Sequence, residues 1–385
     1  MDTMIIAIDG YEANVSRRVG IGRYAYEILR YIYKFKSANC GTNFKLSKFI
    51  FQIYLPEKPL PDMPEETEWW RYRIAKPKKF WTFIGFPFAL LVDRPQADVV
   101  FSPTHYIPRF TSIPKVMAIM DTSYLAYPGM FRVKDLYKLT TWTRFAVSHV
   151  IRIITISQFS KNAIIQAYHV SQERVVVTYP GLTMTNESEF NIFTKYGISR
   201  YFILTVGTIQ PRKNYQRLIE AFSLFLKRNK QKFGEIQLVI IGKKGWLYDE
   251  ILHAPAKYDV ADRVKFLNTV PDSDLPHFYK NALCLALSSL YEGFGLPVLE
   301  AMACNCPVVV SNVSSLPEIA GPAGVYVDPK DTESIAQGLL TAVRQRNLMQ
   351  GKLRIEKGLS QVKKFTWEKA AEQTLAILSD VAANI

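Results

Sequence analysis

The chain has 385 residues, of which 48% are hydrophobic and 21% are charged, and Lys plus Arg exceed Asp plus Glu by 14. At about 150 residues per domain this length predicts two domains, and the apolar content excludes a disordered chain of low hydrophobicity. Four cysteines are too few for a disulfide scaffold, and the chain has no run of about 18 apolar residues that could span a membrane.

The N-terminal residues lack the basic and long apolar segments of a secretory signal, so we expect a cytoplasmic protein with reduced cysteines. Cys304 and Cys306 have the wrong spacing for a zinc site, and we predict no metal. The basic excess is spread over both halves without a recognisable nucleic-acid-binding module, so we expect no nucleic acid partner. The basic excess favours a nucleotide diphosphate or an anionic membrane surface as the binding partner.

Short β-rich runs alternate with longer amphipathic stretches, which is typical of parallel βαβ units. In the first half we expect strands at residues 4–9, 49–54, 99–102, 115–119, 152–156 and 174–178. Helical patterns lie at residues 22–36, 135–150 and 157–168, and Ser157 with Ser160 can cap the last of these.

The second half restarts the same pattern. Strands are expected at residues 201–206, 236–241, 263–267, 282–287, 307–310 and 324–327, and helices at 215–228, 331–344 and 366–381. A polar, turn-rich segment separates the halves. We therefore predict an α/β protein with two doubly wound parallel-sheet domains, residues 1–185 and 200–365, joined by a linker at 186–199. A ligand is expected in the cleft between two facing domains.

The most informative motif is Tyr-Glu-Gly-Phe-Gly-Leu-Pro-Val-Leu-Glu-Ala at residues 291–301, after the predicted strand 282–287. Gly293 and Gly295 let the backbone approach a ligand closely, and Pro297 suits the first turn of a helix. The free N–H groups of such a helix start favour an anion or sugar hydroxyls. Glu292 and Glu300 are then expected to contact two ends of one ligand.

A second motif, Val-Gly-Thr-Ile-Gln-Pro-Arg-Lys-Asn at residues 206–214, follows the first strand of the second half. Gly207 opens a turn, and Arg212 and Lys213 stand where the carboxyl end of that strand would bind an anion. Arginine binds phosphate bidentately, and lysine acts as a point charge. The motif predicts a diphosphate site.

Together these motifs resemble the retaining glycosyltransferases of the group 1 family, also called family 4, which have the GT-B fold. The resemblance rests on Glu-x7-Glu at Glu292 and Glu300 and on Arg212-Lys213-Asn214. It extends to the segments at residues 155–161, 179–181, 307–312 and 316–318. The amino-acid sequence around Arg212 is most similar to that of mannosyltransferases of the family.

The resemblance implies a nucleotide-sugar donor, GDP-mannose or a UDP-hexose, as co-substrate, with no cofactor and no metal. It implies that Arg212 and Lys213 hold the diphosphate and that Glu300 accepts hydrogen bonds from the ribose. Glu292 would orient the transferred sugar, and the last helix, residues 366–385, would cross back to the first domain. Further donor-binding candidates are Gly293, Phe294, Gly295, Leu296, Gly207, Val270 near the base, and Gly22.

In the first domain, the loop at residues 17–24 contains Gly20 and Gly22, which would approach the phosphate or the acceptor. Read as Gly-x-Gly-x-x-Ala, the segment at residues 20–25 also fits a dinucleotide fingerprint, although the loop begins about ten residues after its strand and no acidic residue follows about 20 positions on.

One position departs from the family pattern. Members often carry His-Asp after the strand equivalent to residues 115–119, whereas this chain has Met120-Asp121. Asp121 stays a catalytic candidate. His105 lies at another strand end and is an acceptor-side candidate, or it is a plain packing residue.

The segment at residues 69–81 mixes aromatic and basic side chains, as membrane-surface helices do. Peripheral contact with an anionic membrane at its inner face and ordinary domain packing both remain open. The overall prediction is a retaining, metal-independent hexosyltransferase that acts on a glycan or lipid-linked acceptor. The alternatives are a non-catalytic nucleotide-sugar binder and a dinucleotide-dependent oxidoreductase.

Overall fold

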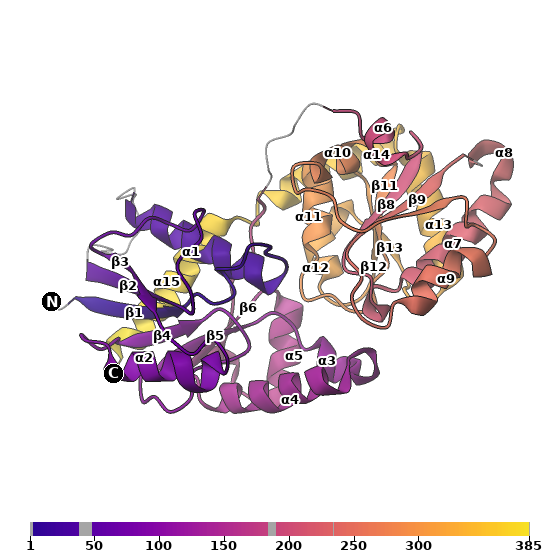
Figure 1. Ribbon diagram of the computed structural model, residues 1–385. Coiled ribbons are helices and arrows are strands. Elements are labelled where there is room, and N and C mark those ends of the chain that lie inside the picture. Colours follow the sequence, from indigo (N-terminus) through magenta and orange to yellow (C-terminus); the bar gives the residue numbers. More distant parts are fainter. Residues whose placement is uncertain (1–2, 38–47, 184–189, 234, 385) are drawn as a thin grey trace. The chain divides into compact units, whose positions relative to one another are not determined.

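The computed structural model describes residues 3–37, 48–183, 190–233 and 235–384 (Figure 1). The chain divides into two compact units. Unit 1 consists of Met1–Leu125, Val133–Gly181 and Thr366–Ile385, and unit 2 consists of Ala126–Arg132 and Leu182–Phe365.

Unit 1 is built on a seven-stranded sheet in the order β3-β2-β1-β4-β5-β6-β7, in which all neighbours are parallel. Its strands are β1 (Met4–Asp9), β2 (Phe49–Leu55), β3 (Trp70–Ile74), β4 (Val99–Ser102), β5 (Lys115–Ile119), β6 (Arg152–Thr155) and β7 (Val175–Val177). The central strands are nearly all apolar, because helices cover both faces of the sheet.

Two sets of helices cover the sheet of unit 1. The apolar clusters place α2 (Phe86–Val92), α4 (Val133–Ser148) and α5 (Gln158–Tyr168) on one face. On the other, α1 (Ile21–Ser37) packs against α15 (Trp367–Ala383), drawn in yellow among the indigo and magenta elements of this unit (Figure 1). Shorter turns are η2 (Trp81–Gly85), α3 (Ser123–Ala126) and η4 (Gln172–Arg174).

Unit 2 repeats this architecture with six parallel strands in the order β10-β9-β8-β11-β12-β13. They are β8 (Phe202–Val206), β9 (Gln237–Ile241), β10 (Val264–Leu267), β11 (Cys284–Leu287), β12 (Val308–Ser311) and β13 (Val325–Val327). Its helices are α6 (Ile192–Tyr196), α7 (Tyr215–Arg228), α8 (Lys230–Phe233), α9 (Asp249–Lys257), α10 (Leu275–Asn281), α11 (Leu296–Ala303), α12 (Leu316–Ala320), α13 (Thr332–Gln345) and α14 (Met349–Val362). Short turns are η3 (Pro128–Met130), η5 (Pro211–Lys213) and η6 (Gly321–Ala323).

Both sheets share a feature that positions ligands. In each, the strand order reverses direction beside the unit's first strand, between β1 and β4 in unit 1 and between β8 and β11 in unit 2. At such a switch point, the loops after the two neighbouring strands run to opposite faces of the sheet. A crevice forms between them at the carboxyl ends of the strands, where doubly wound sheets bind ligands. The prediction of two Rossmann-like α/β domains is confirmed, and the cleft between them stays a prediction.

The structure adds helices that the sequence did not indicate, among them α9, α10 and α14, and it changes the interpretation of two further segments. Residues 70–74 form the edge strand β3, whereas the sequence indicated only a mixed aromatic and basic segment. The predicted linker, residues 186–199, contains α6, whose Lys195 and Tyr196 both donate hydrogen bonds to Asp274 of unit 2. Those polar residues anchor a helix, so the part of this segment that is described belongs to unit 2.

Candidate functional site

The loop from β11 to α11 carries the Glu-x7-Glu motif. Gly295 has a φ of 109°, in the region that favours glycine, and it caps the N-terminus of α11. Pro297 lies in the first turn of α11, as predicted. A Cβ at Gly295 would also lie 2.8 Å from Leu316, so the loop passes close to α12.

Glu292 forms an ion-pair cluster with the two basic residues of the second motif. Lys213 Nζ lies 2.5 Å from Glu292 Oε1, and Arg212 Nη1 lies 3.2 Å from Oε2. The exposed fractions of the Arg212, Lys213 and Glu292 side chains are 14%, 11% and 7%. The sequence predicted these three residues in one site, but it did not predict that they pair with one another.

The cluster controls the ionisation of its carboxylate. Burial alone would raise the pKa of Glu292, but the charges of Lys213 and Arg212, together with hydrogen bonds from Lys213 and Ser289, lower it to about 2. Glu292 is therefore an anion at neutral pH, and the cluster carries one net positive charge.

Sheet order brings the two motifs together. Arg212 and Lys213 form the turn η5 after β8, and Glu292 follows β11, which pairs directly with β8. The backbone also joins them, since Leu290 N donates to Arg212 O at 3.0 Å. The cluster therefore lies at the switch point of unit 2.

Asn214 locks the turn that presents the two cations. It has a φ of 59°, and its side-chain amide donates to Ser288 O at 2.9 Å and to Pro329 O at 2.7 Å. This side chain is 8% exposed. The asparagine of the Arg-Lys-Asn motif thus holds the turn in place, while its two neighbours supply the charge.

Serine side chains hold the Glu292 loop from the other side. Ser289 Oγ donates to Glu292 Oε1 at 2.7 Å, and Glu292 N donates to Ser314 Oγ at 3.1 Å. Ser315 Oγ lies 2.9 Å from Glu292 O and 2.8 Å from Phe294 O. Sequence analysis missed these serines, although Ser314 and Ser315 lie between residues 307–312 and 316–318, two of the segments to which the resemblance extends.

Glu300 lies in α11 and is held by a residue that sequence analysis also missed. The Tyr279 hydroxyl donates to Glu300 Oε2 at 2.5 Å, and Tyr279 is 1% exposed. Burial, and then the charge of Glu300, raise the pKa of Tyr279 well above its usual range. Tyr279 is therefore a neutral donor that orients one oxygen of Glu300.

Two closely packed glycines lie near the cluster, and two unpaired polar atoms lie near it in the chain. Gly207 has a φ of 151°, and a Cβ there would lie 3.2 Å from Lys213 Cε. A Cβ at Gly242, after β9, would lie 1.9 Å from Gly207 O, so only glycine fits. Gln210 Oε1 and Ser288 Oγ are buried without a hydrogen-bond partner, and such atoms suit a ligand.

Two exposed lysines follow Gly242, and the sequence did not single them out. Lys243 and Lys244 follow β9, and Ile209 N donates to Lys243 O at 2.9 Å. The segment Gly-Lys-Lys-Gly at residues 242–245, directly after a predicted strand, was the signal that could have revealed them. They add positive charge next to the Gly207 turn.

The remaining donor-side candidates pack into unit 2. Phe294 is 4% exposed and contacts Phe365 edge to face at 5.6 Å, so its side chain is part of the core. Leu296 starts α11 and is half-buried. Val270 is 6% exposed in the segment after β10, and Gly293 is buried in the Glu292 loop. Of these residues, only the backbone is suited to a polar ligand.

In unit 1, Gly20 and Gly22 lie at the start of α1. Gly20 has a φ of 53°, and a Cβ there would meet nothing within 4 Å, so its surroundings are open. A Cβ at Gly22 would instead lie 2.9 Å from Glu12 O, so this glycine serves close packing of the loop.

His105 and Asp121 belong to the loops after β4 and β5. Burial lowers the pKa of His105, and the charge of Asp121 opposes that shift. His105 Nδ1 is buried without a partner, whereas Asp121 Oδ1 accepts from Ser123 N at 2.9 Å at the start of α3. The Met120 carbonyl accepts a hydrogen bond from Ser160 Oγ at 3.2 Å.

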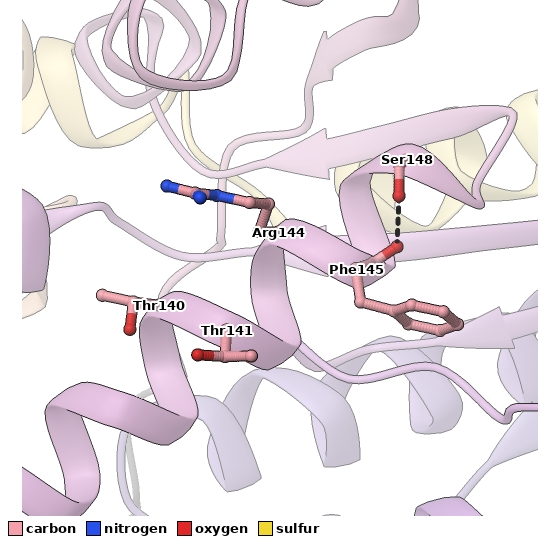
Figure 2. A pocket seen from close by; sticks show the side chains of 5 residues that line it. All are labelled: Thr140, Thr141, Arg144, Phe145 and Ser148. Carbon is pink, nitrogen blue, oxygen red and sulfur yellow. Dashed lines mark hydrogen bonds between the residues drawn. The ribbon is translucent and has the colours of Figure 1, made fainter.

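A separate pocket of about 340 Å³ lies on α4 of unit 1. Figure 2 shows its lining, which is Thr140, Thr141, Arg144, Phe145 and Ser148. It contains none of the predicted site residues. All five lining residues come from one helix, so it is a surface hollow along α4.

Comparison with known proteins gives a family match for the second half of the chain. Residues 188–364 match the family model "Glycosyl transferases group 1", and the matched region covers both motifs. The chain is 33% identical over 229 residues to O-antigen chain mannosyltransferase B of Escherichia coli, covering 58% of this chain and 59% of that protein. It is 28% identical over 256 residues to O-antigen chain mannosyltransferase RfbU of Salmonella typhimurium, covering 66% and 68%. The aligned part thus spans about three fifths of the length of the first relative.

Solved structures confirm the fold over nearly the whole chain. Sucrose-phosphate synthase from Thermosynechococcus elongatus matches with a TM-score of 0.71 at 16% identity, covering 99% of this chain and 100% of that one. Anabaena HepE in complex with UDP and glucose matches with a TM-score of 0.69 at 17% identity, covering 98% and 99%. The chain therefore has the two Rossmann-like domains of the GT-B fold. In the residues described, no helix is both long and apolar enough to cross a membrane.

Proposed function

We propose that this protein is a retaining glycosyltransferase that moves a hexosyl group, mannosyl first, from a nucleotide-diphosphate sugar to a glycan or lipid-linked acceptor. The observation that carries the proposal is the cluster of Arg212, Lys213 and Glu292 at the switch point of unit 2. It combines two cations for a diphosphate with one anion for sugar hydroxyls. The O-antigen mannosyltransferase relatives support a mannosyl donor.

Donor binding exchanges partners within this cluster. The diphosphate carries more negative charge than the Glu292 carboxylate, so it takes over hydrogen bonds from Arg212 and Lys213. Glu292 is still held by Ser289 Oγ at 2.7 Å, and its other lone pairs then accept hydrogen bonds from hydroxyls of the sugar. Glu300, oriented by Tyr279, accepts hydrogen bonds from the ribose hydroxyls in this proposal.

In the transfer step, the bond between the anomeric carbon and the phosphate oxygen breaks, and Arg212 and Lys213 stabilise the charge that develops on the leaving diphosphate. The acceptor oxygen attacks from the same face and forms the new glycosidic bond, so the anomeric configuration is retained. The proton of the acceptor hydroxyl passes to the departing phosphate oxygen. Glu292 orients the sugar and forms no covalent bond to it.

The proposal includes a metal-independent reaction, because two cationic side chains and the N-terminus of α11 supply positive charge at the leaving group. Transfer rates in excess EDTA and in added Mg²⁺ test this point. Equal rates support it, and a rate that falls in EDTA and returns with Mg²⁺ contradicts it. The same proposal places the protein in the cytoplasm, as the sequence predicts.

Unit 1 is proposed to bind the acceptor, with Gly20, His105 and Asp121 as candidates. His105 Nδ1 has no partner in a buried environment, so a hydroxyl of the acceptor can satisfy it. His105→Ala should then raise KM for the acceptor and leave donor hydrolysis unchanged. An unchanged acceptor KM would remove His105 from the proposal.

The donor is tested by thermal shift with GDP-mannose first and UDP-hexoses second, followed by transfer assays over a panel of acceptors and NMR of the anomeric centre in the product. Glu292→Ala and Lys213→Ala should each reduce transfer by at least about 100-fold, the scale of one lost stabilising group. Glu333→Gln is the matched control, since Glu333 is half-exposed and pairs with Arg228 on the surface. Wild-type transfer in both site variants would refute the assignment. Donor binding without turnover over the whole panel would instead indicate a non-catalytic binder.

A further inference from the structure

Among the described residues of unit 1, several large apolar side chains are exposed along one segment. The side chains of Phe80, Ile84, Phe88, Leu91 and Val92 are each 50–61% exposed. Apart from the last, they are spaced four, four and three residues apart along η2 and α2, so they lie on one side of a helical segment. The loop that carries Phe110, which is 85% exposed, lies beside this segment, because the amide of Arg109 donates to Thr82 O of η2.

The opposite side of the same segment is part of the core. Trp81, Phe86 and Leu90 are at most 6% exposed and pack with Tyr54 of the sheet. Trp81 and Phe86 stack at 5.6 Å with an interplanar angle of 5°. A helix that is apolar on all sides is ordinarily buried, so an exposed apolar side on a rigidly seated helix indicates a binding surface.

Basic residues flank this segment along the chain. Lys76, Lys78 and Lys79 precede it, Arg94 follows it, and all four are exposed. Arg109 joins them, with its guanidinium lying 4.5 Å above the ring of Phe83. Residues 69–94 contain six basic residues and one acidic residue, Asp93, which lies 3.5 Å from Arg73 in an ion pair. Lys78 pairs with Glu57 at 3.0 Å, in an exposed pair that salt and water weaken.

The chemistry of this surface selects its partner. Aromatic and branched aliphatic side chains match the acyl boundary of a bilayer, and flanking basic residues match anionic headgroups. A protein partner would equally cover the apolar side chains, but the basic residues then need matching acidic ones. We propose that the docking face, defined as Phe80, Ile84, Phe88, Leu91 and Val92 with the basic residues that flank it, binds unit 1 to an anionic lipid bilayer.

The proposal concerns a surface in unit 1 and does not depend on the reaction at Glu292. Because core packing already holds the helix, binding needs little ordering of the chain, and partitioning follows the apolar area inserted and the charge of the headgroups. It predicts strong dependence on lipid charge and on salt. It also places the protein where a lipid-linked acceptor would be found.

The test is flotation of the full chain with vesicles of phosphatidylcholine alone and of phosphatidylcholine with phosphatidylglycerol in equal parts, at low and at high salt. The wild type should bind the mixed vesicles, bind neutral vesicles at least about ten-fold more weakly, and lose binding at high salt. Phe88→Ser with Leu91→Ser should weaken binding at least ten-fold. Lys76→Gln with Lys79→Gln should weaken it about five-fold per lysine.

Met349→Ser with Leu353→Ser is the matched control, because these two exposed apolar residues lie on α14 of unit 2, outside the docking face. It should bind vesicles like the wild type. All variants replace exposed side chains and should keep the wild-type melting temperature and the thermal shift with nucleotide, which separates this test from that of the proposed function. Equal binding of the wild type and the Phe88/Leu91 variant would overturn the proposal. So would wild-type dimers that disappear in that variant while no vesicle is bound, since a second copy would then cover the face.

Discussion

Replacing Glu292 with glutamine isolates the charge of the cluster, because glutamine keeps the shape of the side chain. The carboxylate lies 2.5 Å from Lys213 Nζ and 3.2 Å from Arg212 Nη1. A pKa lowered from 4.5 to about 2 corresponds to about 3 kcal/mol in favour of the ionised form in the folded protein. Breaking a buried pair from one side costs a similar amount. We therefore expect Glu292→Gln to lower the free energy of unfolding at pH 7 by about 2–4 kcal/mol.

The pH dependence has a definite sign. The pKa of Glu292 is lower in the folded than in the unfolded chain, so its stabilisation is complete above about pH 4.5 and is lost as the pH falls through about 2. Urea unfolding should give a constant difference between wild type and variant from pH 7 to pH 5, and a smaller one below. Glu333→Gln should cost no more than about 1 kcal/mol, because its ion pair with Arg228 is half-exposed.

The same variant reports on ligand binding. In Glu292→Gln, the two cations no longer pair with a carboxylate that a diphosphate must displace. Free nucleoside diphosphate, which has no sugar, should bind about ten-fold more tightly, equivalent to one charge-assisted hydrogen bond of about 1.5 kcal/mol, while sugar transfer falls. Calorimetric titration measures the affinity. Unchanged or weaker nucleotide binding, in a variant that is destabilised as expected, would refute the partner exchange.

Three further substitutions test single contacts. Tyr279→Phe removes the donor to Glu300 Oε2, and should cost about 1 kcal/mol of stability and raise KM for the donor more than it lowers kcat; an unchanged KM would mean that this contact is only structural. Burial raises the pKa of Asp9 to about 6, so the folded protein loses stability as the pH rises through 6. Asp9→Asn should therefore raise the free energy of unfolding at pH 7.5 by about 2 kcal/mol and leave it unchanged at pH 4, as denaturant titrations at both pH values would show. Gly181→Ala places a Cβ 2.1 Å from Trp367 N, so it should lower the free energy of unfolding by about 1–3 kcal/mol and lower the melting temperature. Gly197→Ala is the control for backbone strain without a clash, because Gly197 has a positive φ and its Cβ would meet nothing within 4 Å.

The strands were predictable because both faces of each sheet are covered, so most of them appear as apolar runs such as residues 4–8 and 238–241. The strand β3 was missed because it lies at the sheet edge and is half-exposed. There Trp70 and Tyr72 alternate with Arg71 and Arg73, and charged side chains are usual on an edge. Because aromatic and basic side chains alternate there, the two-residue periodicity of a strand was not recognised in the sequence.

The site was predictable in its residue types but not in its contacts. Glu292, Arg212 and Lys213 follow strands and neighbour glycines, which local sequence reveals. Their ion pairs join positions about 80 residues apart, and no local pattern encodes that distance. The same holds for Tyr279 and Glu300, which lie on neighbouring helices α10 and α11.

The sequence by itself determined which segments are buried, where the chain turns, and which charged side chains belong to the candidate site. Those properties depend on periodicity, glycine and proline positions, and residue chemistry, all of which act over a few neighbouring residues. The tertiary structure alone decided that β8 lies beside β11, and so that Glu292 neutralises one of the two cations. It also decided that the apolar residues of α2 divide between a buried and an exposed side. Both outcomes depend on packing between segments that are distant in the chain. The free energy gained by burying apolar side chains decides that packing only once the whole sheet is assembled.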